Sequence, residues 1–92
     1  MSQPSIFVLQ PFSAQLDSVF ARIIQPAASG AGARVFRADE IESGGLILES
    51  IFQAIEDCSL VIANLTGSNP NVMYELGFAH ALRKPVILIS ES

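Results

Sequence analysis

The chain has 92 residues, of which 50% are hydrophobic and 15% charged, with a net charge of −4. This length fits one domain with one core, and so apolar a composition excludes intrinsic disorder. The acidic balance and the lack of a Lys/Arg cluster disfavour a nucleic-acid surface. No apolar run approaches the ~18 residues of a membrane span and no signal peptide is visible, so we expect a cytoplasmic protein away from membranes.

The N-terminal half of the sequence predicts two strands joined by a helix. Residues 6–9 form a short apolar run, which is typical of a strand buried on both faces. Apolar residues then recur every three or four positions between 14 and 28, which predicts a helix with Ser13 as its N-cap. Two glycines close that helix before a second strand at residues 34–36.

The middle of the chain predicts a second helix and a third strand. A polar loop at residues 37–45 precedes apolar positions with helical spacing at 46–56, which indicates an amphipathic helix. The apolar, β-branched run at 60–63 predicts the third strand. The segment that follows, 64–70, is a dense series of turn-forming residues.

The C-terminal part predicts a third helix and a fourth strand. Asn69 and Pro70 fit the N-cap and the first position of a helix that runs to about Leu82. Residues 86–89 then predict a fourth apolar strand.

Strands that alternate with helices and are apolar throughout predict a parallel sheet with helices on both faces. We therefore predict one flavodoxin-like, three-layer α/β domain over residues 1–92, with four strands in the order 2-1-3-4. Ligands of such sheets bind at the carboxyl ends of the strands, beside the point where the strand order reverses. The loops at 10–13 and 64–69 are expected to face each other there.

Glu75 is the lone carboxylate on the predicted third helix, whose apolar residues extend almost all the way round, so we expect that helix to be largely buried. Phe78 and Ala79, three and four positions on, offer no cation. Removing a carboxylate from water costs free energy, so a buried Glu75 would indicate a role as a nucleophile or as a general acid or base. The alternative is a glutamate that points to solvent.

Two further groups of residues leave open alternatives or exclude a class of site. Asp39 lies after the second strand, where a carboxylate can hold a ribose hydroxyl, although a solvated acidic loop is an equal alternative. Cys58 and His80 are the single cysteine and histidine of the sequence. An internal disulfide therefore lacks a second cysteine, and a structural zinc site lacks enough ligands. We expect no metal and no other cofactor, and Cys58 is expected to be a small buried residue.

Several motifs together resemble a known family. They are the segments 7–12, 37–40 and 61–82. The most specific stretch is 64–85, with Tyr74-Glu75-Leu76-Gly77 and a closing Lys84-Pro85. Over nearly its whole length the chain resembles the nucleoside 2-deoxyribosyltransferase-like group and the related bacterial TIR-like domains.

The resemblance implies cleavage of an N-glycosidic bond, with Glu75 attacking the anomeric carbon of a sugar that then passes to a second base or to water. A nucleoside, a nucleotide or NAD is the implied substrate, and the enzyme would be a transferase or an N-glycoside hydrolase. The residues expected to bind the substrate are Gln10, Pro11, Phe12, Ser13, Asp39, Asn64, Thr66, Gly67 and Asn71.

The sequence departs from the group in two ways. Ser59 and Asn64 stand where aspartates are usual, and the chain stops after the fourth strand, where the group continues with another strand and helix. The fourth strand is therefore expected to be an open apolar edge, covered in a homo-oligomer or in a larger parent protein. These departures favour the alternative of a non-catalytic nucleotide-binding or TIR-like assembly and signalling module.

Overall fold

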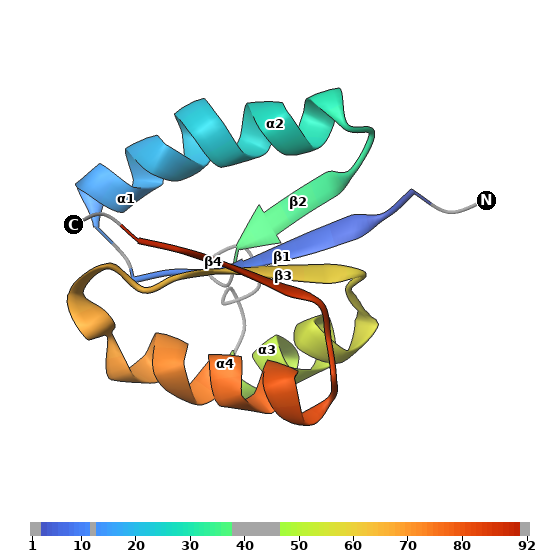
Figure 1. Cartoon of the computed structure of the whole chain (residues 1–92), viewed down its shortest axis with the longest axis vertical. Coiled ribbons are helices and arrows are strands. Elements are labelled where there is room, and N and C mark those ends of the chain that lie inside the picture. Colours follow the sequence, from blue (N-terminus) through green and yellow to red (C-terminus); the bar gives the residue numbers. More distant parts are fainter. Residues whose placement is uncertain (1–2, 12, 38–46, 91–92) are drawn as a thin grey trace.

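The predicted fold class is confirmed by the structure, a computed structural model that describes residues 3–11, 13–37 and 47–90. Its parallel sheet has the strand order β2-β1-β3-β4, as the sequence predicts (Figure 1). The strands are β1 (Ser5–Leu9), β2 (Arg34–Arg37), β3 (Leu60–Asn64) and β4 (Val86–Ile89). Most of the predicted polar loop at 37–45 lies outside the described residues, and a single domain over residues 1–92 stays a prediction.

One long helical segment covers one face of the sheet (Figure 1). It consists of α1 (Ala14–Val19), η1 (Phe20–Ile24) and α2 (Gln25–Gly30). The predicted N-cap is confirmed, because the Oγ of Ser13 accepts a hydrogen bond of 3.1 Å from the amide of Leu16.

The sequence predicts one regular helix here, whereas the structure contains a π-helical turn, η1, in its middle. The amide of Gln25 donates to the carbonyl of Phe20, the i→i+5 bond of a π-turn. Pro26, which follows, has no amide hydrogen for an i→i−4 bond. The wider turn before Pro26 is consistent with this missing donor.

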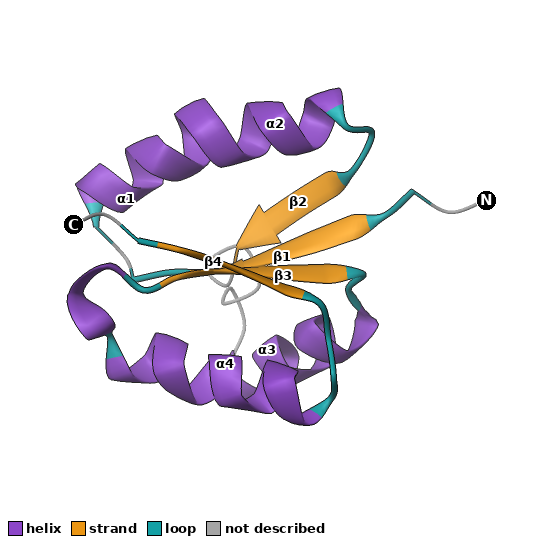
Figure 2. Cartoon of the chain, in the orientation of Figure 1, coloured by secondary structure: helices purple, strands orange, loops and turns teal. Residues whose placement is uncertain are grey.

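The other face is covered by α3 (Ile47–Asp57) and α4 (Pro70–Ala81), as Figure 2 shows in purple. A 3-10 turn, η3 (Thr66–Ser68), leads into α4. The predicted cap of α4 is confirmed, because the Oδ1 of Asn69 accepts from the amides of Asn71 at 2.9 Å and Val72 at 3.2 Å. None of the described helices is long and apolar enough to cross a bilayer.

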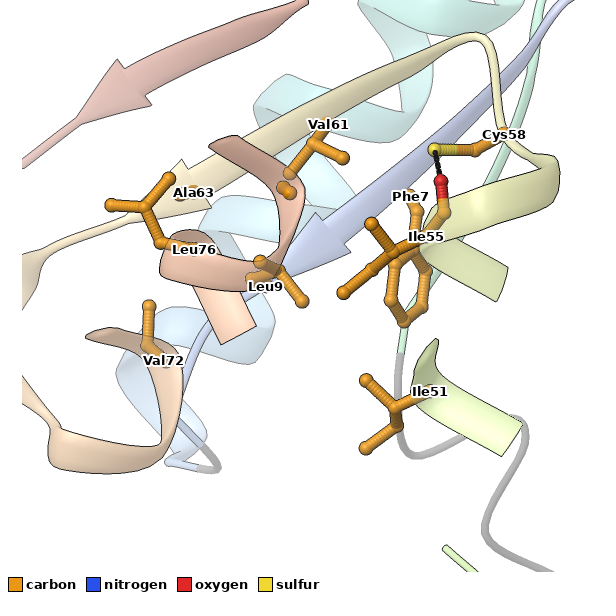
Figure 3. Close-up of a cluster of buried hydrophobic side chains, with 10 residues drawn as sticks. Phe7, Leu9, Ile51, Ile55, Cys58, Val61, Ala63, Val72 and Leu76 are labelled. Atoms are coloured by element: carbon orange, nitrogen blue, oxygen red, sulfur yellow. Dashed lines mark hydrogen bonds between the residues drawn. The ribbon is translucent and has the colours of Figure 1, made fainter. Parts of the chain in front are cut away.

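The larger core lies between the sheet and the pair α3–α4 (Figure 3). Cys58 is buried there as expected, with its thiol donating to the carbonyl of Ile55 at 3.2 Å, and burial raises the pKa of that thiol. Ten of the described residues are buried in this core: Phe7, Leu9, Ile51, Ile55, Cys58, Val61, Ala63, Val72, Leu76 and Ala79.

The smaller core lies on the other face. Val8, Phe20 and Ile24 form it, because β1 turns Phe7 and Leu9 to one side and Val8 to the other. In the described part of the chain, β4 is an edge strand with Ile87 and Leu88 49% and 53% exposed, so the prediction of an apolar edge strand is confirmed there. Self-association through it stays a prediction.

Candidate functional site

The candidate site lies where β1 and β3 end side by side. Leu9 and Ala63 are register partners in this parallel pair, so the next residues, Gln10 and Asn64, are neighbours at the carboxyl edge. Strand order reverses between β1 and β3. The two loops that the sequence selects therefore leave the sheet at the same edge, at the switch point.

Gln10 is tied to the start of the helical layer. Its side chain is 7% exposed, and its Nε2 donates to the carbonyl of Leu16 at 3.1 Å. Ser13 is occupied as the N-cap described above, and Pro11 between them is half-buried. Phe12, also predicted to bind substrate, lies outside the described residues. The side chains of Gln10 and Ser13 thus hold the loop after β1 against α1.

Asn64 shapes the loop after β3. It is 1% exposed, and its Oδ1 accepts from the amide of Thr66 at 3.0 Å. The next residues turn sharply, since Gly67 has a φ of 76° and Ser68 a φ of 50°. Left-handed backbone suits glycine, which explains the residue at position 67. The structure therefore gives Asn64 a role in loop geometry that the sequence did not reveal.

Glu75 is buried in the second turn of α4. It is 9% exposed and shares the inward side of the helix with Val72, Leu76 and Ala79. The prediction that this carboxylate is withdrawn from water is confirmed, and the alternative of a solvent-facing glutamate is wrong. Asn71, one turn earlier, is exposed.

The prediction that the helix of Glu75 is buried on nearly all sides is wrong. Met73 and Tyr74 are 47% and 63% exposed, and Leu82 follows the helix with 39% exposed. The physical reason is that α4 lies in an outer layer, with the sheet on one side and α3 beside it (Figure 1). An apolar composition alone does not provide a covering layer on the remaining side.

Arg37, at the end of β2, binds the helical layer at the same edge of the sheet. Its Nη1 lies 2.7 Å from the Oδ1 of Asp17, and its guanidinium lies 4.2 Å from the ring centroid of Phe20. Sequence reasoning missed this contact because Asp17 and Arg37 are twenty residues apart. Asp39, two residues further on, lies outside the described residues.

The candidate residues approach the edge from two layers. Strand alternation places Gln10 and Asn64 on the side of Val8 and Ile62, towards α1, and the bond from Gln10 to Leu16 agrees with this. Glu75 comes from α4 on the opposite side. A ligand that touches all three must lie across the edge of the sheet.

A hollow of about 460 Å³ opens on the α1 side of β3 and β4. Ile23 lines it from the helix, Ile62, Ile87 and Ile89 line it from the sheet, and Asn64 and Ser90 are its polar lining residues. Sequence reasoning missed this hollow. The signal was present, because four apolar strands with only three predicted helices leave part of one face without cover.

Among residues 3–11, 13–37 and 47–90, no group of three or more His, Cys, Asp and Glu side chains is arranged to hold a metal ion. The expectation that the protein needs no cofactor stays a prediction.

Comparisons with known proteins agree with this geometry. The nucleoside 2-deoxyribosyltransferase family matches residues 9–92. A 2-deoxyribosyltransferase from Bacillus psychrosaccharolyticus superposes with a TM-score of 0.74 at 21% identity, over 94% of this chain and 72% of the other. The Clostridium botulinum CMP N-glycosidase BcmB superposes with a TM-score of 0.67 at 24% identity, over 94% and 68%. At these identities the two structures establish the fold. No protein of curated function matches in sequence.

Proposed function

The chain belongs to the nucleoside 2-deoxyribosyltransferase family, which matches residues 9–92, and from this premise we propose that it breaks the N-glycosidic bond of a nucleoside or nucleotide with Glu75 as the nucleophile. The observation that carries the proposal is the burial of Glu75, at 9% exposure, on a helix that begins at the carboxyl edge of the sheet. TIR-like character stays a prediction from the sequence.

The chemistry requires a carboxylate and no further cofactor. A carboxylate oxygen of Glu75 attacks the anomeric carbon, the bond from that carbon to the base nitrogen breaks, and the base leaves with the electron pair and takes up a proton. The glycosyl ester on Glu75 is then attacked by a second base or by water, the ester bond breaks to free the carboxylate, and the attacking group loses a proton to solvent, which replaces the proton that the first base took up. The acceptor alone distinguishes a transferase from a hydrolase.

The surroundings of Glu75 suit this reaction in two respects. Burial keeps competing water away, so the negative charge stabilises an oxocarbenium-like transition state more strongly than an exposed carboxylate does. Glu75 also lies on a helix with a capped N-terminus. Val72, Leu76 and Ala79 of the same helix pack in the core, and this packing holds Glu75 in position before the substrate binds.

The substrate-binding part of the proposal keeps the predicted residues and divides their roles. Ser13 and Asn64 shape the two loops through their bonds to backbone amides, and act on the substrate through loop position. Direct contacts are assigned to a second group, of which Phe12 and Asp39 lie outside the described residues. That group is Gln10, Pro11, Phe12, Asp39, Thr66, Gly67 and Asn71.

A second candidate function is a non-catalytic nucleotide-binding or assembly module. The exposed apolar side chains of β4 favour it, because an open sheet edge promotes association. Under this alternative a nucleotide binds at the carboxyl edge but is released unchanged.

The test is product formation from a panel of nucleosides, nucleoside monophosphates and NAD, followed by chromatography. We expect wild type to release a free base and Glu75→Gln to lose activity by at least about 10³-fold, because an amide cannot replace the nucleophile. Glu56→Gln is the matched control, since Glu56 is an exposed glutamate on α3. Binding without product by the wild type supports the module instead, and full activity of Glu75→Gln contradicts the assigned nucleophile.

A further inference from the structure

The side-chain oxygen of Gln10 is a buried hydrogen-bond acceptor without a donor among the residues that the structure describes. The side chain is more than nine-tenths buried, and its Nε2 donates to the carbonyl of Leu16 at 3.1 Å. A buried acceptor that has lost water and gained no protein donor is unfavourable, and such groups are uncommon in folded proteins.

The orientation of this amide follows from its partner. The carbonyl of Leu16 is an acceptor, so only the Nε2 of Gln10 can face it. Rotating the amide by half a turn would bring two acceptor oxygens together. Gln10 therefore presents an oxygen, and not an N–H group, on its remaining side.

The place of this oxygen in the fold points to a ligand. Gln10 directly follows β1 at the switch point, where Asn64 is its neighbour on β3. The Oδ1 of Asn64 already accepts from the amide of Thr66, at 3.0 Å. Of these two neighbouring side-chain acceptors, Gln10 is therefore the one that still lacks a donor.

We propose that Gln10 determines specificity in this site, by accepting a hydrogen bond at Oε1 from an O–H or N–H group of the nucleoside. The inference rests on the proposed function and deepens it. A fixed acceptor binds a sugar hydroxyl or an exocyclic amino group, and it disfavours a carbonyl or a phosphate oxygen at the same place. Because this oxygen is buried, the donor reaches it only by displacing atoms that cover it.

Burial makes this contact selective. Water does not compete for a buried acceptor, so a ligand that lacks the donor leaves the oxygen unpaired and binds more weakly. Because the same amide holds the carbonyl of Leu16, its oxygen is fixed by the first turn of α1 and does not follow the ligand. Selectivity then depends on one oxygen in one place.

The experiment compares pairs of substrates that differ by one donor. The sugar pairs are a ribonucleoside with its 2′-deoxy form and a 2′-deoxynucleoside with its 2′,3′-dideoxy form. The pair that differs in the base is an adenine nucleoside with the purine nucleoside that lacks only the 6-amino group. For one pair we expect wild type to prefer the donor-bearing member by about 10-fold or more in kcat/KM. In Gln10→Met that preference falls to near unity. If the preference is lost for a sugar pair, the donor is a hydroxyl. If it is lost for the pair that differs in the base, the donor is an amino group.

The matched control is Gln53→Met, the same replacement at an exposed glutamine that donates to Asp57 on α3. It keeps the wild-type preference. A purely structural role of Gln10 would lower kcat/KM for both members of every pair equally, so unchanged ratios in Gln10→Met overturn the proposal.

Calorimetry measures the dissociation constants of the same substrate pairs without any Gln10 variant. Wild-type protein is used for ligands that it does not cleave, and Glu75→Gln for ligands that the wild type cleaves. Equal dissociation constants within every pair overturn the proposal, and so does the absence of nucleoside binding. A protein that binds donor-bearing nucleosides selectively but forms no product keeps the inference for Gln10 and rejects only the catalytic proposal for Glu75.

Discussion

The two faces of the sheet are covered very differently. Beneath α3 and α4, ten of the described residues are buried in a continuous core. On the other face, the segment from α1 to α2 packs with Val8, Phe20 and Ile24 as the buried residues of its core. Beside that segment lies the hollow over β3 and β4.

This difference relates packing to function. Glu75, the proposed nucleophile, stands on the well-packed face, and Gln10 and Asn64 face the less crowded side. We therefore expect the face beneath α3 and α4 to provide stability and to hold the proposed nucleophile in place. The face beneath α1 and α2 is expected to provide space for a ligand. The following experiments compare matched positions on the two faces.

The largest expected effect comes from truncating one isoleucine on each face. Ile55, a residue of α3, is completely buried in the larger core, whereas Ile24 borders the hollow at 6% exposed. We expect Ile55→Ala to cost about 4 kcal/mol of unfolding free energy and Ile24→Ala about 2 kcal/mol, because the space left beside an existing opening relaxes or fills with water. Urea unfolding followed by circular dichroism measures both, and equal costs would contradict the comparison.

A smaller effect is expected from removing one helix cap on each face. Asn69 accepts from two backbone amides at the start of α4, whereas Ser13 accepts from one at the start of α1. We expect Asn69→Ala to cost about 1.5 kcal/mol and Ser13→Ala about 1 kcal/mol. The reverse order in urea unfolding would show that the helix of Glu75 is not the more firmly fixed of the two.

The smallest effect concerns Cys58 in the larger core. Burial raises the pKa of its thiol above the usual value, and the charge of Lys84 opposes this shift. The folded chain holds the proton more tightly, so this contribution to stability is complete below the pKa of the unfolded thiol, near 9.0, and is lost as pH rises towards the folded value. We expect iodoacetamide at pH 8 to modify native protein far more slowly than urea-unfolded protein.

Cys58→Ala is the control for this measurement. It removes the thiol, so its stability should decline less than that of the wild type as pH rises above 9.0. Equal alkylation rates for native and unfolded wild type would show that the core beneath α3 opens readily.

Much of the fold could be predicted because its signals are local. Apolar runs and helical spacing located the four strands and most helix limits. The order 2-1-3-4 was predicted as the simplest layout of alternating elements with right-handed crossovers, and it is confirmed. The caps at Ser13 and Asn69 were predictable because a side-chain oxygen beside the first turn satisfies amides within three residues. Glu75 was selected as the only carboxylate on an apolar helix, and its predicted burial is confirmed.

The features that escaped prediction depend on distance or on small changes of backbone. The π-turn before Pro26 needs a shift of one residue in hydrogen bonding, which periodicity does not resolve. The bonds of Gln10 to Leu16 and of Asn64 to Thr66 depend on loop paths that composition does not encode. The exposed side of α4 and the hollow depend on how many layers surround each element.

Trapping a covalent intermediate is the most direct test of Glu75 as the nucleophile. Wild-type protein is incubated with a nucleoside or nucleotide that it cleaves, without an acceptor base, quenched in acid, digested and analysed by mass spectrometry. If Glu75 is the nucleophile, we expect a glycosyl adduct on the peptide that contains Glu75, and no adduct with Glu75→Gln. Release of free base at the wild-type rate by Glu75→Gln, with no adduct on Glu75 in the wild type, would contradict it.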